Sequence, residues 1–540
     1  MHGGNRHVPW GLIRWGIVTL LTVYVIIPLL VPGFIPTHDG EYHLIRIWQF
    51  GKMLGSGYLF PRWAPDINSG YGLPLFNFQY PFPNYVGALW HRLGWSLADS
   101  VKLTLAAGYA GSVIFCAFWL SELFSPLSAW AGTVFFMFVP YWFVDIYVRG
   151  SVGETLAMMW VMMALWATEK KYAAALSVSI GLLIVTHNIS AMLFVPLITL
   201  YVLVRRIRLW PAILTGIGLA AYFWFPALVE KRYMTGLNTT NFRDYFPRLD
   251  QLLVPSWGTG FSGGMIGDND MSAQIGIVPM LIFLLSFFAV IRDGVRKKTD
   301  GRTFFWGAIL MVSLVMMQEA SQPVWEAFPF LSFIQYPWRF LSFVIVTSAF
   351  FGAYVSTRLP RVITILLLLG AVAATTAYVR PVTYAARNDA YYLSRKNFTD
   401  GTSSLGNALS TIWTGWKQTR PPAPVTLIGG EATISEVAAA PLMVAASVQA
   451  GRTSTVQINR LYYPGWTAKV DGRAVSVQNS AGVLRISVPA GEHRIVASFH
   501  ETPWRLLADI VSLASLAYLG YTMLQVYAHR HKHTSPHDRP

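Results

Sequence analysis

The sequence predicts an α-helical integral membrane protein of about twelve transmembrane helices, with a β-sandwich domain inserted before the last helix. The first observation is composition: of 540 residues, 54% are hydrophobic and 12% are charged, about half the charged fraction of soluble domains. The second is a series of apolar runs, such as 362–379, near the roughly 20 residues that cross a bilayer core. The third is a late segment whose alternating residues and turn pairs are typical of strands.

Basic residues indicate the orientation, because Lys and Arg concentrate at the cytoplasmic ends of spans. Arg14 precedes the first apolar run and the tail 529–533 is basic, so both termini are expected in the cytoplasm. Lys170 and Arg205 are also expected inside, so the stretch between them must cross an even number of times. Thr186-His187-Asn188 divides it into two short spans. One long buried helix carrying these polar residues is the alternative.

The remaining spans follow in chain order from these anchors. A crossing at 81–95 would place Lys170 outside, so this segment is expected to lie along the outer membrane surface. The spans are predicted at 15–34, 100–121, 127–143, 154–168, 172–186, 190–204, 209–228, 275–291, 303–318, 340–357, 362–379 and 504–527.

Three domains result from these spans. Residues 1–379 form a transmembrane core with a first outer loop at 35–99 and a second large outer loop at 229–274. Residues 380–503 form an extracytoplasmic β-sandwich-like domain, and residues 504–540 form the last helix and a basic cytoplasmic tail. Strands are predicted at 453–459, 467–470, 483–488 and 493–499, separated by the turn pairs Pro464-Gly465, Asp471-Gly472 and Ala490-Gly491.

Charge and cysteine content exclude other classes. The net charge of +15 comes from basic residues at span ends rather than from a nucleic-acid reader motif, so the lipid bilayer is the expected partner and nucleic acid is not. Cys116 is the single cysteine, so an internal disulfide is excluded.

The most informative motif follows the first span and reads Thr37-His38-Asp39-Gly40-Glu41-Tyr42-His43. Two carboxylates and two histidines beside hydrocarbon cost free energy unless they are hydrated, so an unhydrated set indicates a functional role. These residue types suit proton transfer. The bland alternative is a hydrated loop in which Asp39 caps a helix that begins near Gly40.

Several further motifs accompany this one in a fixed order, and together they resemble a bacterial membrane family labelled "6-pyruvoyl-tetrahydropterin synthase-related", close to the YfhO-type proteins. The resemblance covers nearly the whole chain. The motifs are Phe60–Asp66, Gly70–Pro74, Tyr80–Pro83, Arg149–Glu154, Thr186–Asn188, Gln335–Phe340 and Tyr462–Trp466.

This resemblance implies the large C-type glycosyltransferase fold, in which an acidic residue of the first outer loop serves as general base or positions the acceptor. The donor is then a sugar on a polyprenyl phosphate or diphosphate. Asp39 is the first candidate for the catalytic residue and Glu41 the second. Gly40 separates the two carboxylates, whereas the superfamily more commonly has an adjacent acidic pair, which leaves their division of labour open.

Two arginines suit the phosphate of such a donor. Arg149 and Arg339 fall at predicted outer span ends, and a guanidinium can donate two parallel hydrogen bonds to a phosphate. Snorkelling to lipid headgroups is the alternative for both, and an internal pair with Glu154 is a further alternative for Arg149. Glu154 is included among the expected substrate-binding residues.

Four more polar residues complete the expected substrate site. His187 and Asn188 would contact the acceptor or the phosphate, or would only satisfy free backbone groups at a hairpin tip. His38 and His43 are also assigned to substrate binding. No cofactor is expected, although His38, His43 and Asp39 could hold a divalent cation.

The sequence therefore predicts a glycosyltransferase of the plasma (inner) membrane, which moves a sugar from a polyprenyl-phosphate-linked donor to a cell-envelope glycan or lipid outside the cytoplasm. A lipid or glycan transporter or flippase is the first alternative, but transporters commonly show internal repeats and the two halves of this sequence show none. A non-catalytic envelope assembly factor that binds glycans through the β-domain is the second.

Overall fold

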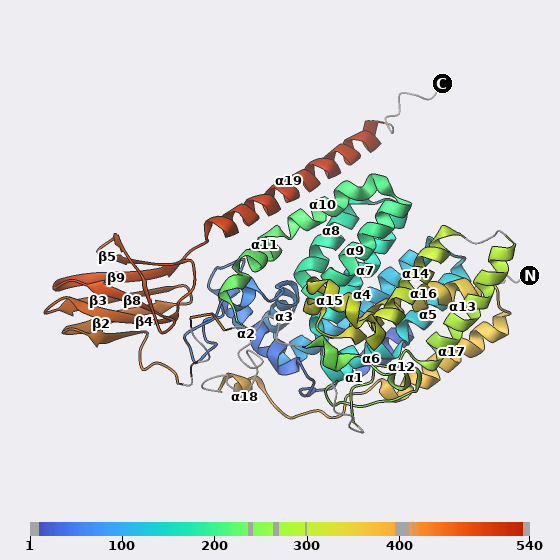
Figure 1. Ribbon diagram of the computed structural model, residues 1–540, viewed down its shortest axis with the longest axis horizontal. Coiled ribbons are helices and arrows are strands. Elements are labelled where there is room, and N and C mark those ends of the chain that lie inside the picture. The colour runs from blue at the N-terminus through green and yellow to red at the C-terminus, as the bar shows by residue number, and fades with distance from the viewer. Residues whose placement is uncertain are drawn as a thin grey trace, which may run out of the picture. The chain divides into compact units, whose positions relative to one another are not determined.

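The computed structural model describes residues 10–235, 241–262, 269–296, 300–394, 410–413, 417 and 419–532 (Figure 1). The predicted basic tail lies outside the described residues from 533 onward. The chain divides into two compact units. Unit 1 comprises Met1–Gly40, Ala98–Gly216 and Thr240–Ala386, and unit 2 comprises Glu41–Leu97, Ile217–Thr239 and Arg387–Pro540.

Helices make up most of the described chain (Figure 1). They are α1 (Trp10–Leu30), α2 (Gly40–Gly55), α3 (Phe82–Arg92), α4 (Leu97–Ser121), α5 (Pro126–Met137), α6 (Pro140–Phe143), α7 (Val152–Lys170), α8 (Ala173–Thr186), α9 (Asn188–Arg205), α10 (Trp210–Leu219), α11 (Ala221–Glu230), α12 (Leu249–Leu253), α13 (Ile277–Val295), α14 (Gly301–Met316), α15 (Gln322–Ala327), α16 (Leu341–Ser356), α17 (Arg361–Thr375), α18 (Asp389–Leu393) and α19 (Pro503–Lys532).

Many of these helices suit a bilayer. Within the described residues, 7 are each long and apolar enough to cross a membrane, namely α1, α4, α9, α13, α16 with the turn before it, α17 and α19. Three bent pairs meet the same criterion only together: α5 with the segment 140–149, α10 with α11, and α14 with α15. With α7 and α8, helices occupy every predicted span. The chain is a multi-pass membrane protein with a C-terminal β-domain, as the sequence predicted.

The boundaries of several spans were predicted incorrectly. The first helix ends at Leu30 instead of residue 34, because Pro32 and Gly33 follow. The span predicted at 127–143 is bent by 47°. Pro140 cannot donate a backbone hydrogen bond, so α5 stops at Met137 and a new helix begins at Pro140. The span predicted at 209–228 is likewise two helices, with a 63° bend.

Two further segments bear on the predicted topology. His187 is a single extended residue (φ −160°, ψ 110°) between α8 and α9, so the stretch is not one continuous helix. The segment 81–95 contains α3, of 11 residues, which spans only about 16 Å at 1.5 Å per residue. That is about half of a bilayer core. The orientation of these segments in the membrane stays a prediction.

The β-domain is a sandwich of two antiparallel sheets. One has the order β1-β4-β8-β7 and the other β2-β3-β9-β5-β6. The strands are β1 (Val425–Gly429), β2 (Ala432–Ala440), β3 (Met443–Ala450), β4 (Ser454–Leu461), β5 (Trp466–Val470), β6 (Arg473–Val475), β7 (Gln478–Ser480), β8 (Val483–Val488) and β9 (Gly491–Phe499).

The four predicted strands correspond to β4, β5, β8 and β9, and the other five were missed. Strands β2 and β3 are rich in alanine, which has little intrinsic preference for strands. They pair with each other, and β3 also pairs with β9. Trp466 at the start of β5 is 6% exposed and packs against Phe499 and Trp63 at ring-centroid distances of 5.5 and 5.8 Å. The core of the sandwich therefore includes this tryptophan.

A buried ion pair joins distant segments within unit 2. Arg505 of α19 donates from Nε and Nη2 to Glu230 of α11, both at 2.9 Å, and their side chains are 0% and 2% exposed. Tyr463 of the β-domain donates its hydroxyl to the same carboxylate at 2.8 Å. Asn77 of the 35–99 segment donates to it at 2.7 Å. One buried carboxylate therefore binds three other parts of the unit.

Removal of this carboxylate should destabilise the protein strongly. In Glu230→Ala the buried guanidinium of Arg505 keeps only a pair at 4.0 Å with Glu501, and loss of one partner of a buried ion pair costs about 3–5 kcal/mol. Lys52→Ala is the matched control, because the Lys52 side chain is 42% exposed in its pair with Asp66 and such pairs contribute about 1 kcal/mol or less. Thermal unfolding of the purified protein in lipid nanodiscs measures both. An equal loss of stability in Glu230→Ala and Lys52→Ala would contradict the structural role given to the Glu230 carboxylate.

Candidate functional site

The motif 37–40 rests on the segment 148–150, both in unit 1. His38 donates its backbone N–H to the carbonyl of Val148 at 3.0 Å, and Asp39 donates its own to the carbonyl of Arg149 at 2.8 Å. Gly150 has φ +63°, and a Cβ at this position would overlap the side chain of Thr37. Glycine is the residue that tolerates both conditions. The backbone of the motif is therefore held in one place beside Arg149.

Arg149 belongs to a buried cluster of charged side chains. Its Nη1 donates to Glu154 at 2.8 Å, to the hydroxyl of Tyr141 at 3.2 Å, and to Asp145. The Tyr141 hydroxyl donates to Glu154 at 2.8 Å. All four side chains are buried, and the guanidinium also lies 4.8 Å from the ring centroid of Trp338. The internal pair with Glu154, the alternative left open by the sequence, is present.

Arg339 completes this cluster and has hydrogen-bonding capacity to spare. Its Nη1 donates to the carbonyl of Ile334 at 2.9 Å and to the Gln335 side chain at 3.1 Å. Its Nε is buried and 4.0 Å from Glu154, and no acceptor bonds it among the described residues. A buried donor without an acceptor costs about 1–3 kcal/mol. Such a donor is suited to an incoming anion.

The local backbone explains why these side chains converge. After Pro140 begins α6, the chain continues as a π-helix over Val144–Arg149. Such wide turns are frequent at functional sites. Gly150 and Ser151 both donate their backbone N–H to the carbonyl of Asp145, the latter at 2.9 Å. Helix α7 starts immediately afterwards, so Glu154 lies in its first turn and faces Arg149.

The sequence did not single out Asp145 or Tyr141, and it included Trp338 only as part of the motif Gln335–Phe340. Asp145 was detectable: it is an acidic residue within the aromatic and apolar run Tyr141–Val148, and a charge inside a span indicates a functional or paired group. No comparable signal identified Tyr141 or Trp338 among the 25 tyrosines and 21 tryptophans of the chain.

The two candidate carboxylates differ in their surroundings. Asp39 is partly exposed, and among the described residues its carboxylate takes part in no hydrogen bond or ion pair. Glu41 pairs with Arg387 at 2.6 Å within unit 2. Helix α2 begins at Gly40, as the capping alternative required. Of the two carboxylates, Asp39 is the one left available to a ligand.

The histidines also separate. Nε2 of His38 lies 2.9 Å from the carbonyl of Thr259, and its ring stacks on Phe261 at a centroid distance of 4.5 Å. Burial lowers the pKa of His38 from its ordinary 6.5, and the charge of Arg149 adds to this, whereas the Thr259 carbonyl and Asp39 oppose it. A neutral His38 donates Nε2–H to Thr259. His43 is 3% exposed and belongs to unit 2.

His187 and Asn188 lie where α9 begins. Nδ1 of His187 accepts the backbone N–H of Ser190 at 3.2 Å, which caps the helix. This is the backbone-satisfying role considered from the sequence. The ring also interacts electrostatically with Glu154, Arg339 and Arg149, so His187 borders the cluster. Asn188 is exposed in the first turn of α9.

The arrangement offers no ready metal site in the part of the chain that the structure describes. No group of three or more His, Cys, Asp or Glu side chains lies close enough together there to hold a metal ion.

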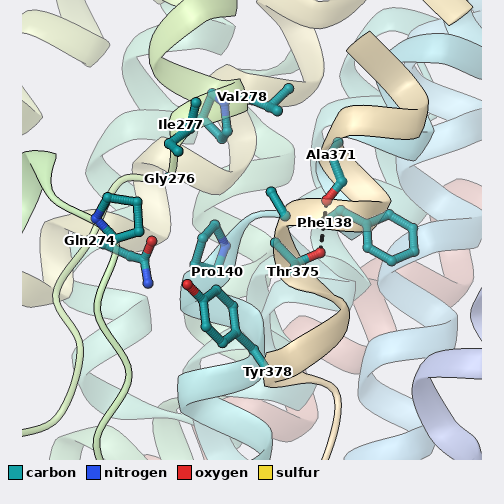
Figure 2. Close-up of a pocket in the computed structure, with 12 residues that line it drawn as sticks. Phe138, Pro140, Gln274, Gly276, Ile277, Val278, Ala371, Thr375 and Tyr378 are labelled. Carbon is teal, nitrogen blue, oxygen red and sulfur yellow. Dashed lines mark hydrogen bonds between the residues drawn. The ribbon is translucent and has the colours of Figure 1, made fainter. Parts of the chain in front are cut away.

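An apolar cavity lies beside the segment that carries the cluster (Figure 2). Its volume is about 140 Å³, and it is bounded by the ends of α6, α13 and α17. Pro140, the residue before Tyr141, forms part of its wall, and a Cβ on Gly276 (φ +97°) would come within 2.8 Å of that proline ring. The other lining residues include Phe138, Ile277, Ala371 and Tyr378.

Comparison with known proteins returned one curated relative and several solved structures. No family model matches the chain, so the resemblance to the pterin-synthase-related family stays a prediction. An uncharacterized protein of Lactococcus lactis subsp. cremoris is 24% identical over 39% of this chain and 39% of its own length.

The solved structures include three glycosyltransferases. ArnT of Cupriavidus metallidurans, bound to undecaprenyl phosphate, has a TM-score of 0.43 at 13% identity. The match includes 69% of this chain and 64% of the ArnT chain. Mycobacterial arabinofuranosyltransferase AftD has a TM-score of 0.43 at 18% identity, and the match includes 69% of this chain and 27% of AftD. The oligosaccharyltransferase of Archaeoglobus fulgidus has a TM-score of 0.41 at 14% identity, and the match includes 74% of this chain and 59% of the oligosaccharyltransferase. Similarities of this size do not by themselves assign an activity.

Substitution of Gly150 should disturb the backbone segment that is hydrogen-bonded to Asp39. In Gly150→Ala the new methyl group meets Thr37, and an alanine at φ +63° is strained, which together cost at least about 1–3 kcal/mol. Gly301→Ala is the control, because nothing lies within 4 Å of a Cβ there. Thermal unfolding in nanodiscs compares the two. A Gly150→Ala protein as stable as Gly301→Ala would contradict the packing described.

His38 should give the protein a specific pH dependence. Because its pKa is lower in the folded chain than in the unfolded chain, the unfolded chain binds the proton first as the pH falls below about 6.5. The stability contributed by neutral His38 is complete above that pH and declines below it. His38→Asn should remove this part of the decline, measured as unfolding temperature between pH 7.5 and 5. An identical profile in both proteins would refute the burial of a neutral ring.

Proposed function

We propose that this chain is a membrane glycosyltransferase that transfers a sugar from a polyprenyl-phosphate-linked donor to a cell-envelope glycan or lipid. The observation that carries the proposal is the available carboxylate of Asp39. The backbone N–H of Asp39 is hydrogen-bonded to the carbonyl of Arg149, which belongs to the buried cluster with two arginines. Glycosyl transfer needs these two elements, a base for the acceptor and cationic donors for the leaving phosphate. On the predicted orientation, both lie at the extracytoplasmic end of the spans.

The reaction then assigns one role to each group. Asp39 accepts the proton of an acceptor hydroxyl while the hydroxyl oxygen forms a bond to the anomeric carbon. The bond between that carbon and the phosphate oxygen breaks, and its electron pair leaves with the polyprenyl phosphate. Arg339, whose Nε has no acceptor among the described residues, stabilises the charge that develops on the phosphate.

Arg149 has a positioning role in this scheme. Its Nη1 is occupied by Glu154, Tyr141 and Asp145, so it contributes its charge and holds the backbone on which Asp39 rests. Glu154 keeps Arg149 and Arg339 close despite their like charge, at 2.8 and 4.0 Å respectively. His187 borders the same cluster and would orient the phosphate or the acceptor.

The apolar cavity suits a few isoprene carbons of the donor, because its volume is about 140 Å³. Pro140, in its wall, is covalently adjacent to Tyr141 of the cluster. In this scheme, isoprene carbons next to the phosphate would pack against Phe138, Ile277 and Ala371. Burial of each CH₂ group in such surroundings contributes about 0.8 kcal/mol.

Substitution of Asp39 tests the chemistry. Asp39→Asn is nearly isosteric but cannot accept the proton, so turnover should fall by at least about 100-fold, with little change in expression or donor binding. Glu41→Gln is the control, because Glu41 is engaged by Arg387, and it should stay within a few-fold of wild type. The assay follows radiolabelled sugar from a polyprenyl-phosphate donor in nanodiscs. An inactive Glu41→Gln beside an active Asp39→Asn would make Glu41 the base.

Substitution of Arg339 separates binding from chemistry. Arg339→Ala should weaken donor binding about 10- to 100-fold, as expected for a lost charge-assisted hydrogen bond of about 1.5–3 kcal/mol. Arg339→Lys should recover only part, because a point charge does not reproduce a planar fork. Equilibrium binding of polyprenyl phosphate measures this. If Asp39→Asn and Arg339→Ala both kept full transfer activity, the roles assigned to these two residues would be wrong. If the wild-type protein transferred no sugar, a transporter or an assembly factor would replace the glycosyltransferase proposal.

A further inference from the structure

Three aromatic side chains form a partly exposed corner in unit 2. The rings of Tyr233 and Trp413 stack at 26° with centroids 5.4 Å apart, and Tyr462 meets Trp413 at 89° and 4.9 Å. All three are partly exposed, whereas Tyr463 and Trp466 beside them in sequence are buried. The corner is therefore a surface feature and not part of the sandwich core.

Backbone hydrogen bonds fix this corner in place. Thr235 donates to the carbonyl of Ser410 at 2.7 Å and Ile412 donates to that of Tyr233 at 3.0 Å, which forms a short antiparallel bridge next to Trp413. Tyr462, at the end of β4, donates to the carbonyl of Gly482 at 2.8 Å. Rings held by backbone lose little conformational entropy when they bind a ligand.

Polar groups surround the same rings. Nη2 of Arg232 donates to the Tyr233 hydroxyl at 2.9 Å, and its guanidinium lies 4.9 Å from that ring. Arg232 itself is exposed. On the bridge strand, the side-chain hydroxyls of Ser410 and Thr411 are buried, at 3% and 2% exposure, and have no hydrogen-bond partner among the described residues. Unsatisfied buried hydroxyls are costly and call for a partner such as water or a ligand hydroxyl.

A strained turn binds the backbone of Lys417, four residues after Trp413 in the sequence. Asn68 and Ser69 have φ values of 53° and 58°, a region that non-glycine residues seldom adopt and that concentrates at ligand sites. Their side chains bond the backbone of Lys417, each at 2.6 Å. Lys417 in turn lies 5.9 Å from the ring of Tyr71. The turn thus fixes the backbone of a cationic residue in the same unit as the corner.

We propose that the Tyr233–Trp413–Tyr462 corner binds a sugar ring of a saccharide chain. A pyranose presents one face of C–H bonds, which packs on an aromatic ring, and an edge of hydroxyls, which can accept hydrogen bonds from a donor such as the guanidinium of Arg232. The combination of rigid aromatic area with a few polar groups matches this chemistry. The identification of that saccharide as the acceptor rests on the proposed function, whereas binding itself does not.

Binding to the full-length protein tests the inference. The probes are linear hexasaccharides of glucose, N-acetylglucosamine and galacturonic acid, titrated calorimetrically. Nanodiscs are used instead of maltoside micelles, because the maltose headgroup would compete. At least one hexasaccharide should bind, and Trp413→Ala should weaken its binding about tenfold or more, equivalent to about 1.4 kcal/mol. Trp413→Phe should retain part of the affinity because an aromatic face remains.

The control is Trp504→Ala, which removes a tryptophan that is 49% exposed in the same unit and should leave binding unchanged. Arg232→Ala, at an exposed position, keeps the test valid if Trp413→Ala fails to fold, and it should also weaken binding. Absence of binding by all three probes, or equal binding by wild type, Trp413→Ala and Arg232→Ala, would overturn the inference. Trp413-dependent binding of a hexasaccharide by a wild-type protein that transfers no sugar would support this inference and overturn the proposed function, so the two failures are distinguishable.

Discussion

The site depends on the neutralisation of Arg149 inside a helical bundle. A guanidinium buried without a counter-charge would cost several kcal/mol, and Asp145 and Glu154 remove that cost by accepting from one nitrogen. Their positions follow from the local backbone, in which a π-helical turn ends at Arg149 and α7 begins at Val152. Because the guanidinium is fixed, the carbonyls of Val148 and Arg149 are fixed too. The motif that carries Asp39 uses those carbonyls as its support.

This support separates two carboxylates that are two residues apart. The backbone N–H groups of His38 and Asp39 are both occupied by the 148–150 segment. The carboxylate of Asp39 takes part in no hydrogen bond or ion pair among the described residues. Glu41 belongs to the other unit and is held by Arg387. A base must have a free acceptor and a defined position. Only one of the two carboxylates meets both conditions.

Unit 2 also contains a buried ion pair, and there the pair joins distant segments of the chain. The buried carboxylate of Glu230 binds Arg505, Tyr463 and Asn77, which come from the last helix, the β-domain and the 35–99 segment. Arg62, 6% exposed, adds ion pairs to Glu501 and Asp509. Directional bonds of this kind specify which segments meet, whereas apolar packing alone tolerates several arrangements. The aromatic corner at Trp413 is built on the same unit, so its geometry depends on that assembly.

The sequence by itself determined the membrane class, the positions of the spans and four strands of the β-domain, because apolar length and alternation are local properties. It also indicated Asp39, Arg149 and Arg339, since charged groups beside hydrocarbon are seldom accidental. Only the tertiary structure decided that Glu154 and Asp145 neutralise Arg149, that Glu41 is engaged by Arg387, and that His187 caps α9. Glu41 and Arg387 are 346 residues apart, so no local pattern relates them. The partners of Arg149 and His187 are near in sequence, but local pattern left other roles open for both residues, and the backbone geometry selected these contacts. The bends of 47° before Pro140 and 63° between α10 and α11 were also seen only in the tertiary structure.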